Sequence, residues 1–194
     1  STWTVTFPNG FVPNPLAVGE PETVTFNTLV DWSTHPNEGV KYFSGTAVYV
    51  QESTLTRPPS DGERVILDLG NVKDFADVTV NGVTCPTLWK PPFRIDITDI
   101  VNATGNPQPS LQLNVKITNL WPNRLIGDDF KPADSQFEQG NIMERRLLEW
   151  PQFIQEEQPS PSGRYTFTTW RHWTKEDKLL PSGLLGPVVI RYVK

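Results

Sequence analysis

Apolar and polar residues alternate along most of this chain with the two-residue period of β-strands. The clearest run is residues 111–118, in which leucine, valine and isoleucine occupy every second position. Such a run turns one apolar face toward a core and one polar face toward solvent. Similar patterns or short apolar runs occur at residues 3–7, 40–50, 65–69, 78–80, 93–98, 165–173 and 188–193. The sequence therefore predicts about eight or nine strands.

The connections between these runs carry turn residues. Asn81-Gly82 stands between Val80 and Val83 and predicts a two-residue hairpin, because both central residues of that turn need positive φ. The chain also contains 19 prolines, which a largely helical protein would not tolerate. Many short strands joined by such turns predict an all-β fold, a sandwich or jelly roll.

One long segment, residues 119–163, separates two predicted strands and has no strand pattern of its own. A connection of this length usually has a function or some structure of its own. Apolar residues recur within it at helical spacing, at Met143, Leu147, Trp150 and Ile154. We predict two short helices here, with Pro151 in the first turn of the second. We also expect the segment to fold back on the sandwich, since it would otherwise expose a large apolar patch.

Length and charge narrow the class of protein. The 194 residues fit a single domain, 1–194, with 119–163 as a long insertion. The net charge of −5 argues against nucleic acid as a partner, because binding to phosphates needs clustered lysine and arginine. No apolar run approaches the roughly 20 residues of a membrane-spanning helix, so a membrane is not expected as a partner either.

Few residue patterns suggest a cofactor. His35 and His172 lie far apart, and the single cysteine excludes an intrachain disulfide and a two-cysteine metal site. Nucleotide-binding glycine motifs are absent, so we expect no cofactor. A structural calcium ion held by loop carbonyls leaves no readable signature, and the sequence neither predicts nor excludes one.

The candidate chemistry is concentrated in the insertion and the segment after it. Sugar rings have apolar faces that stack on aromatic rings, and their hydroxyls pair with planar polar groups. Trp121-Pro122-Asn123-Arg124, followed by Asp128, supplies both kinds of group, and so does Trp170-Arg171-His172-Trp173. We predict a carbohydrate-binding site formed by Trp121, Asn123, Arg124, Asp128, Trp150 and Trp173. The alternative is that Arg124 and Asp128 form a structural ion pair.

Hydrolysis of a glycoside needs two carboxylates that face one another across the sugar. The nearby acids are Asp128, Asp129, Glu144, Glu149 and Asp177. Their spacing pairs no two of them, so we predict no catalytic residue in this chain.

Several motifs resemble known domains of glycoside hydrolases. Residues 43–49, 67–72 and 77–82 resemble the galactose-binding-like jelly roll that forms the sugar-binding domain of glycoside hydrolase family 2. Residues 118–128, 166–170 and 180–188 resemble the C-terminal jelly-roll domain of family 106 α-L-rhamnosidases. In such enzymes the catalytic carboxylates lie on a separate (β/α)₈ barrel, which needs about 250 residues.

This resemblance implies a non-catalytic, carbohydrate-binding accessory domain of a secreted or periplasmic hydrolase of plant polysaccharide. Its partners would be carbohydrate and a catalytic domain of the same polypeptide. Two alternatives stay open: a small enzyme that uses acids of the insertion, and a structural domain that only braces a catalytic barrel. Asn102-Ala103-Thr104 is also a glycosylation sequon, and it is predicted to lie in a loop.

Overall fold

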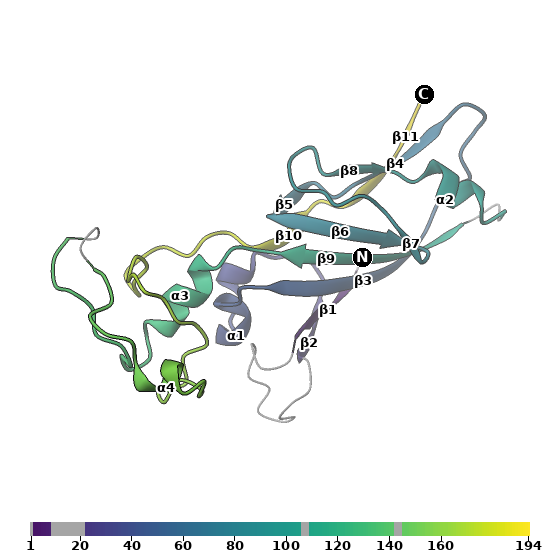
Figure 1. Ribbon diagram of the computed structural model, residues 1–194. Coiled ribbons are helices and arrows are strands. Elements are labelled where there is room, and N and C mark those ends of the chain that lie inside the picture. Colours follow the sequence, from purple (N-terminus) through teal and green to yellow (C-terminus); the bar gives the residue numbers. More distant parts are fainter. Residues whose placement is uncertain (1, 9–21, 106–108, 142–144) are drawn as a thin grey trace.

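The computed structural model describes residues 2–8, 22–105, 109–141 and 145–194. Its largest element is a six-stranded antiparallel sheet with the strand order β2-β1-β3-β9-β6-β7 (Figure 1). The strands are β2 (Glu22–Phe26), β1 (Trp3–Phe7), β3 (Thr46–Thr54), β9 (Ser110–Thr118), β6 (Phe75–Val80) and β7 (Val83–Thr84). Strands β9 and β3 pair over their full lengths and form the centre of this sheet.

Two smaller sheets cover one face of the large one. The first has the order β11-β4-β8, with β11 (Val189–Val193), β4 (Arg64–Asp68) and β8 (Arg94–Asp96). The second pairs β5 (Asn71–Lys73) with β10 (Gly183–Gly186). The helices are short: η1 (Trp32–Thr34), α1 (Glu38–Lys41), α2 (Thr98–Asn102), α3 (Pro122–Asp128) and α4 (Gln152–Gln155).

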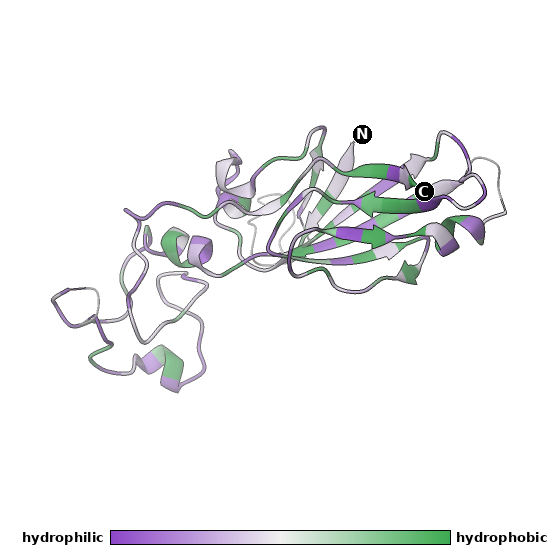
Figure 2. Cartoon of the chain, turned by 90° about the horizontal axis from the view of Figure 1, so that it is seen from above, coloured by the Kyte–Doolittle hydropathy of each residue, from purple (hydrophilic) through white to green (hydrophobic). Residues whose placement is uncertain are grey.

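The two layers share one hydrophobic core. Tyr49 and Val115 of the large sheet and Leu67 of the small one are fully buried in the same cluster. Apolar residues follow the strands in both layers (Figure 2). Because every second residue of a strand faces the core, the alternation in the sequence translates directly into this packing. The prediction of an all-β sandwich is confirmed.

The predicted hairpin is also present. Asn81 and Gly82 have φ values of 50° and 80° and connect β6 to β7. The side chain of Asn81 accepts a hydrogen bond from the Gln112 backbone N–H, at 2.8 Å, which ties the turn to β9.

Two predicted strands differ from the structure. The run at 40–50 begins in α1, where the Asn37 side chain caps the helix through the Gly39 N–H at 2.8 Å, and only its second part belongs to β3. Residues 165–173 form no strand and make only one isolated bridge, between Arg146 and Trp170. Their backbone N–H groups donate instead to the Asp128 carboxylate and to separate loop carbonyls, which prevents a regular ladder.

The helices of the insertion are also placed differently. Residues 145–150 are not helical, because the Leu147 N–H bonds to the Thr169 carbonyl and the Leu148 N–H to the Gln136 carbonyl. Met143 lies outside the described residues. The second predicted helix is present as α4, with Pro151 as its N-cap rather than in its first turn. A helix that the spacing of apolar residues did not predict, α3, occupies Pro122–Asp128.

The insertion therefore runs from residue 119 to residue 182, between β9 and β10. It extends from one end of the sandwich instead of folding back over it (Figures 1 and 2). Among the described residues, seven of the eleven large apolar side chains that are exposed belong to it. They are Leu120, Trp121, Phe130, Leu148, Trp150, Tyr165 and Trp170. The expectation that the insertion hides its own apolar side chains against the sandwich is wrong.

Acid should weaken one surface contact of the sandwich. A hydrogen bond from Arg57, at 2.7 Å, together with the Ser60 N–H, lowers the pKa of Glu63 to about 2. A carboxyl whose folded pKa lies below its unfolded value stabilises the fold above the unfolded pKa and loses that contribution as the pH falls through the folded pKa. We expect Glu63→Gln to be less stable than the wild type at neutral pH. The difference, measured by urea denaturation, should vanish between about pH 5 and about pH 2; a pH-independent difference would contradict this cause.

Candidate functional site

Helix α3 joins the insertion to the sandwich, and its polar side chains are buried. Pro122 begins the helix, where its missing N–H costs nothing. Asn123 donates to the Leu180 carbonyl at 2.8 Å and to the Ser182 hydroxyl at 3.0 Å, and it accepts from the Leu180 N–H at 2.7 Å. Asn119 donates to the same Ser182 hydroxyl, at 3.0 Å. The two ends of the insertion are therefore held together by amide side chains.

Arg124 and Asp128 form an ion pair on α3, with 3.3 Å between Arg124 Nε and Asp128 Oδ1. The contact is a charge pair without hydrogen-bond alignment. Both side chains are buried, with 5% and 1% of their surfaces exposed. The Arg124 guanidinium lies 4.9 Å from the centre of the Tyr165 ring, and burial lowers the pKa of Arg124 despite the nearby carboxylate. The ion pair therefore lies between α3 and the segment that contains Tyr165, away from solvent.

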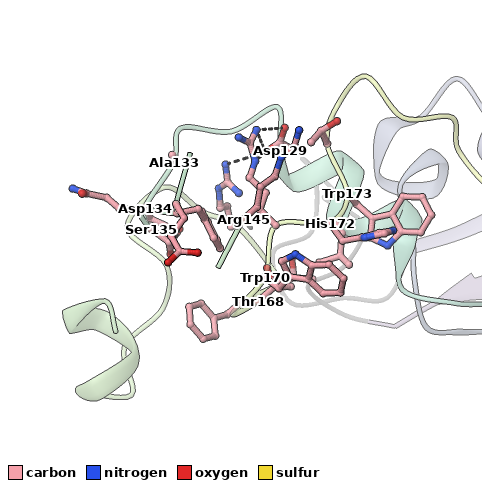
Figure 3. Close-up of a pocket in the computed structure, with 18 of the residues that line it drawn as sticks. Asp129, Ala133, Asp134, Ser135, Arg145, Thr168, Trp170, His172 and Trp173 are labelled. Atoms are coloured by element: carbon pink, nitrogen blue, oxygen red, sulfur yellow. Dashed lines mark hydrogen bonds and ion pairs between the residues drawn. The ribbon is translucent and has the colours of Figure 1, made fainter. Parts of the chain in front are cut away.

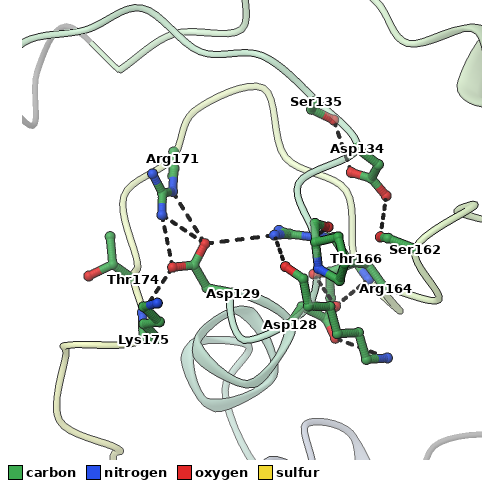
Figure 4. Close-up of polar contacts among 12 residues, drawn as sticks. Asp128, Asp129, Asp134, Ser135, Ser162, Arg164, Thr166, Arg171, Thr174 and Lys175 are labelled. Carbon is green, nitrogen blue, oxygen red and sulfur yellow. Dashed lines mark hydrogen bonds and ion pairs between the residues drawn. The ribbon is translucent and has the colours of Figure 1, made fainter.

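The other oxygen of Asp128 holds a segment of the insertion that is distant in sequence. It accepts from the Tyr165 N–H and the Thr166 N–H, both at 2.8 Å, and from the Thr166 hydroxyl at 2.7 Å (Figure 4). Lys131 lies 4.0 Å from the carboxylate. One buried carboxylate therefore fixes residues 165–166 against α3.

Asp129 makes a second junction next to this one. Arg171 approaches both of its oxygens, at 3.0 and 2.9 Å, and the Lys175 N–H donates to it at 3.1 Å (Figure 4). Arg164 lies 3.9 Å away. The Asp129 side chain is 5% exposed, whereas that of Arg171 is 44% exposed. The ion pair therefore presents a guanidinium to solvent at a fixed position.

Beside this junction, three aromatic rings lie in a row along residues 170–173. The Trp170 and His172 rings are 5.2 Å apart, and the His172 and Trp173 rings 4.9 Å, both edge to face (Figure 3). They line an open depression of about 1870 Å³ together with Asp129, Arg145, Arg164 and Arg171. Flat apolar faces and fixed planar polar groups thus meet in one hollow, which we call the aromatic depression.

The residues predicted from the sequence divide into two groups. Trp121 and Trp150 are exposed, at 58% and 56%, and Trp173 is half-buried in the depression. Asn123, Arg124 and Asp128 are buried, with their polar groups directed to other parts of the protein. The structure brings Trp173 together with Trp170 and His172. The three polar residues instead hold the insertion in place. Arg145 and Arg164 also line the depression, and they carried no sequence signal because the segments that form it are far apart in the sequence.

Three of the acids considered from the sequence are held by other groups in the structure. Asp128 and Asp129 are occupied by cations and backbone N–H groups, and Asp177 accepts from the Thr174 N–H at 2.8 Å. Glu149 is exposed, and Glu144 lies outside the described residues. Among the described residues, no group of three or more histidine, cysteine, aspartate and glutamate side chains is arranged to hold a metal ion. None of the helices in these same ranges is long and apolar enough to cross a membrane.

No protein-family model matches the chain. The chain is similar to a protein of Formosa agariphila named "Putative beta-glucuronidase", with 43% identity over 190 residues, which are 97% of this chain and 15% of that protein. Its structure is similar to that of a rhamnosidase from Novosphingobium sp. PP1Y, with a TM-score of 0.68 and 30% identity, over 98% of this chain and 14% of that one. Both similarities include the insertion and support an association with glycoside hydrolases. The chain spans about one seventh of the length of either relative.

Proposed function

We propose that this chain is a non-catalytic accessory domain of a larger glycoside hydrolase, with a jelly-roll sandwich of the galactose-binding-like kind. The resemblance of several motifs to those of family 2 and family 106 enzymes supports this proposal. So do the two relatives, whose names are those of a glucuronidase and a rhamnosidase. In this proposal residues 1–194 form one domain, and the catalytic carboxylates lie elsewhere in the polypeptide.

The aromatic depression is the proposed carbohydrate site, and the row Trp170–His172–Trp173 beside the Asp129–Arg171 pair is the observation that carries it. Pyranose rings stack on flat aromatic faces, and their hydroxyls pair with guanidinium and carboxylate groups. Here Trp173 or Trp170 takes the sugar face, and Arg171 or Arg145 takes hydroxyls. In this proposal the sugar does not contact Asn123, Arg124 or Asp128. These three residues hold in place the segments that carry the aromatic rings. Trp121 lies on the exposed surface of the insertion, where a longer glycan would reach it, whereas Trp150 lies outside the depression.

We expect Trp173→Ala to weaken binding of rhamnose- or galactose-containing oligosaccharides by about tenfold, because a stacked ring contributes roughly 1 kcal/mol or more. The melting temperature should stay nearly unchanged, since Trp173 lies outside the core cluster. Titration calorimetry with both kinds of oligosaccharide measures the affinity.

Trp89→Ala is the matched control, because Trp89 is 63% exposed and lies away from the depression. It should leave the affinity unchanged. If the wild-type chain gives no heat with either class of sugar, the carbohydrate site is refuted, and the role of a purely bracing domain takes its place.

The proposal extends to location and modification. A hydrolase of plant polysaccharide works outside the cytoplasm, so we place the protein in the extracellular space or the periplasm.

Asn102 is exposed at the end of α2 rather than in the predicted loop, and an attached glycan would be solvated there. Occupancy of this sequon needs a eukaryotic secretory pathway. An unshifted mass after glycosidase treatment of the natively produced protein would exclude it.

A further inference from the structure

We infer that the insertion docks on a neighbouring domain of the same polypeptide through an apolar groove next to the aromatic depression; this inference rests on the proposed function. The groove is lined by Arg146, Leu147, Leu148, Glu149, Trp150, Thr169 and Trp170. It has a volume of about 610 Å³. We call it the Leu148–Trp150 groove.

The walls of the groove are large apolar side chains held by their neighbours. Leu148 is 58% exposed and Trp150 56%. The Trp150 ring lies 5.5 Å from the Phe167 ring, which in turn meets Phe153 at 6.5 Å. The backbone on both sides is tied by the bridge between Arg146 and Trp170. The exposed surface is therefore supported from within the insertion and is not a loose loop tip.

The insertion lacks a hydrophobic core of its own. Among its described residues, Ile126 is the only apolar side chain that is fully buried, and no residue between Ile117 and Leu184 belongs to the core cluster. Ordering a segment of this length costs backbone entropy, which apolar burial normally offsets. Exposed apolar surface concentrated on one such segment marks an interaction site.

A protein domain fits this groove better than a sugar. Four of its seven lining residues are leucine or tryptophan, and the polar ones are one arginine, one glutamate and one threonine. The aromatic depression on the neighbouring side has those groups. Both relatives contain the whole region, insertion included, as 15% and 14% of a longer chain, so each has ample protein beside it. Docking would place the aromatic depression at a domain boundary, where ligand sites commonly occur.

Hydroxyl-radical footprinting of the natural gene product and of the 194-residue chain tests this inference. We expect oxidation of Trp150 and Leu148 to be several-fold slower in the gene product than in the 194-residue chain. Trp89, which is 63% exposed on the sandwich, should react alike in both. Equal oxidation of Trp150 in both proteins would overturn the docking.

Leu148→Asp provides an independent readout. It should leave the melting temperature of the 194-residue chain unchanged and lower that of the gene product, whereas Val83→Asp, at a comparably exposed position on β7, should affect both proteins alike. A concentration-dependent dimer of the 194-residue chain that Leu148→Asp dissociates would also overturn the inference, since a second copy would then fill the groove.

The two proposals fail in different ways. If the gene product has a glycosidase domain but Trp150 reacts as fast as in the short chain, only the docking is wrong. If the gene product has no further domain, the proposed function is wrong and the docking inference falls with it.

Discussion

Gly70→Ala is expected to lower the free energy of unfolding by about 3 kcal/mol or more. Gly70 has φ of +67°, and a Cβ there would lie 2.5 Å from the carbonyl carbon and oxygen of Gly186 and 2.7 Å from the Pro187 oxygen. These neighbours are backbone atoms, so no side chain can rotate away. Gly70 and Gly186 form the bridge that joins the turn after β4 to the end of β10. The added methyl group would therefore push the turn after β4 away from the end of β10, in the smaller layer of the sandwich.

Gly62→Ala is the control for this variant, because it introduces the backbone strain without the close contact. Gly62 has a similar φ of +74°, but a Cβ there would meet nothing within 4 Å. It should cost only about 1 kcal/mol, the penalty of the left-handed conformation. Urea denaturation of both variants measures the difference. Equal losses would show that the contact with Gly186 contributes nothing beyond strain.

Arg124→Ala is expected to cost about 3–5 kcal/mol, because it leaves the buried carboxylate of Asp128 without its main counterion. Asp128 is 1% exposed and holds Tyr165 and Thr166 through their backbone N–H groups. The substitution also removes the guanidinium beside the Tyr165 ring. We expect a lower melting temperature and faster proteolysis of the insertion, measured by calorimetry and by limited digestion.

Arg64→Ala is the matched control for this variant. Arg64 also pairs with an aspartate, Asp96, at 2.7 Å, but its side chain is 63% exposed and that of Asp96 is 38% exposed. Exposed pairs contribute about 0–1 kcal/mol. If Arg124→Ala were as mild as Arg64→Ala, the buried pair would not be what attaches the insertion to the sandwich.

This attachment links stability to the proposed binding site. Asp128 and Asp129 are neighbours in sequence, yet one faces the buried arginine and the other the rim of the aromatic depression. A change that displaces α3 would therefore move Arg171 and the rings that follow it. If Arg124→Ala also lost sugar binding, the cause would be displacement of the aromatic depression. The lower melting temperature of the variant would reveal this cause.

The sequence by itself determined the sandwich. Alternation at residues 3–7 and 111–118 and the Asn81-Gly82 turn are confirmed, since the side-chain period of a strand and the φ of a tight turn are local properties. The interiors of strands were easier to predict than their ends. Residues 40–50 contain both a helix and a strand, because the Asn37 cap outweighs the strand propensity of Val40.

Only the tertiary structure decided the form of the insertion. Residues 165–173 have the composition of a strand, but their backbone N–H groups bond to Asp128 and to the Arg145 carbonyl. The sequence predicted one site from Asn123, Arg124, Asp128 and Trp173. In the structure the three polar residues are buried, whereas Trp173 lies in the aromatic depression. Pairs such as Asp129 and Arg171 are 42 residues apart and leave no periodic pattern, so only the folded chain shows that they meet. Local patterns specify elements, whereas contacts between distant segments decide which polar groups are buried and which side chains face a ligand.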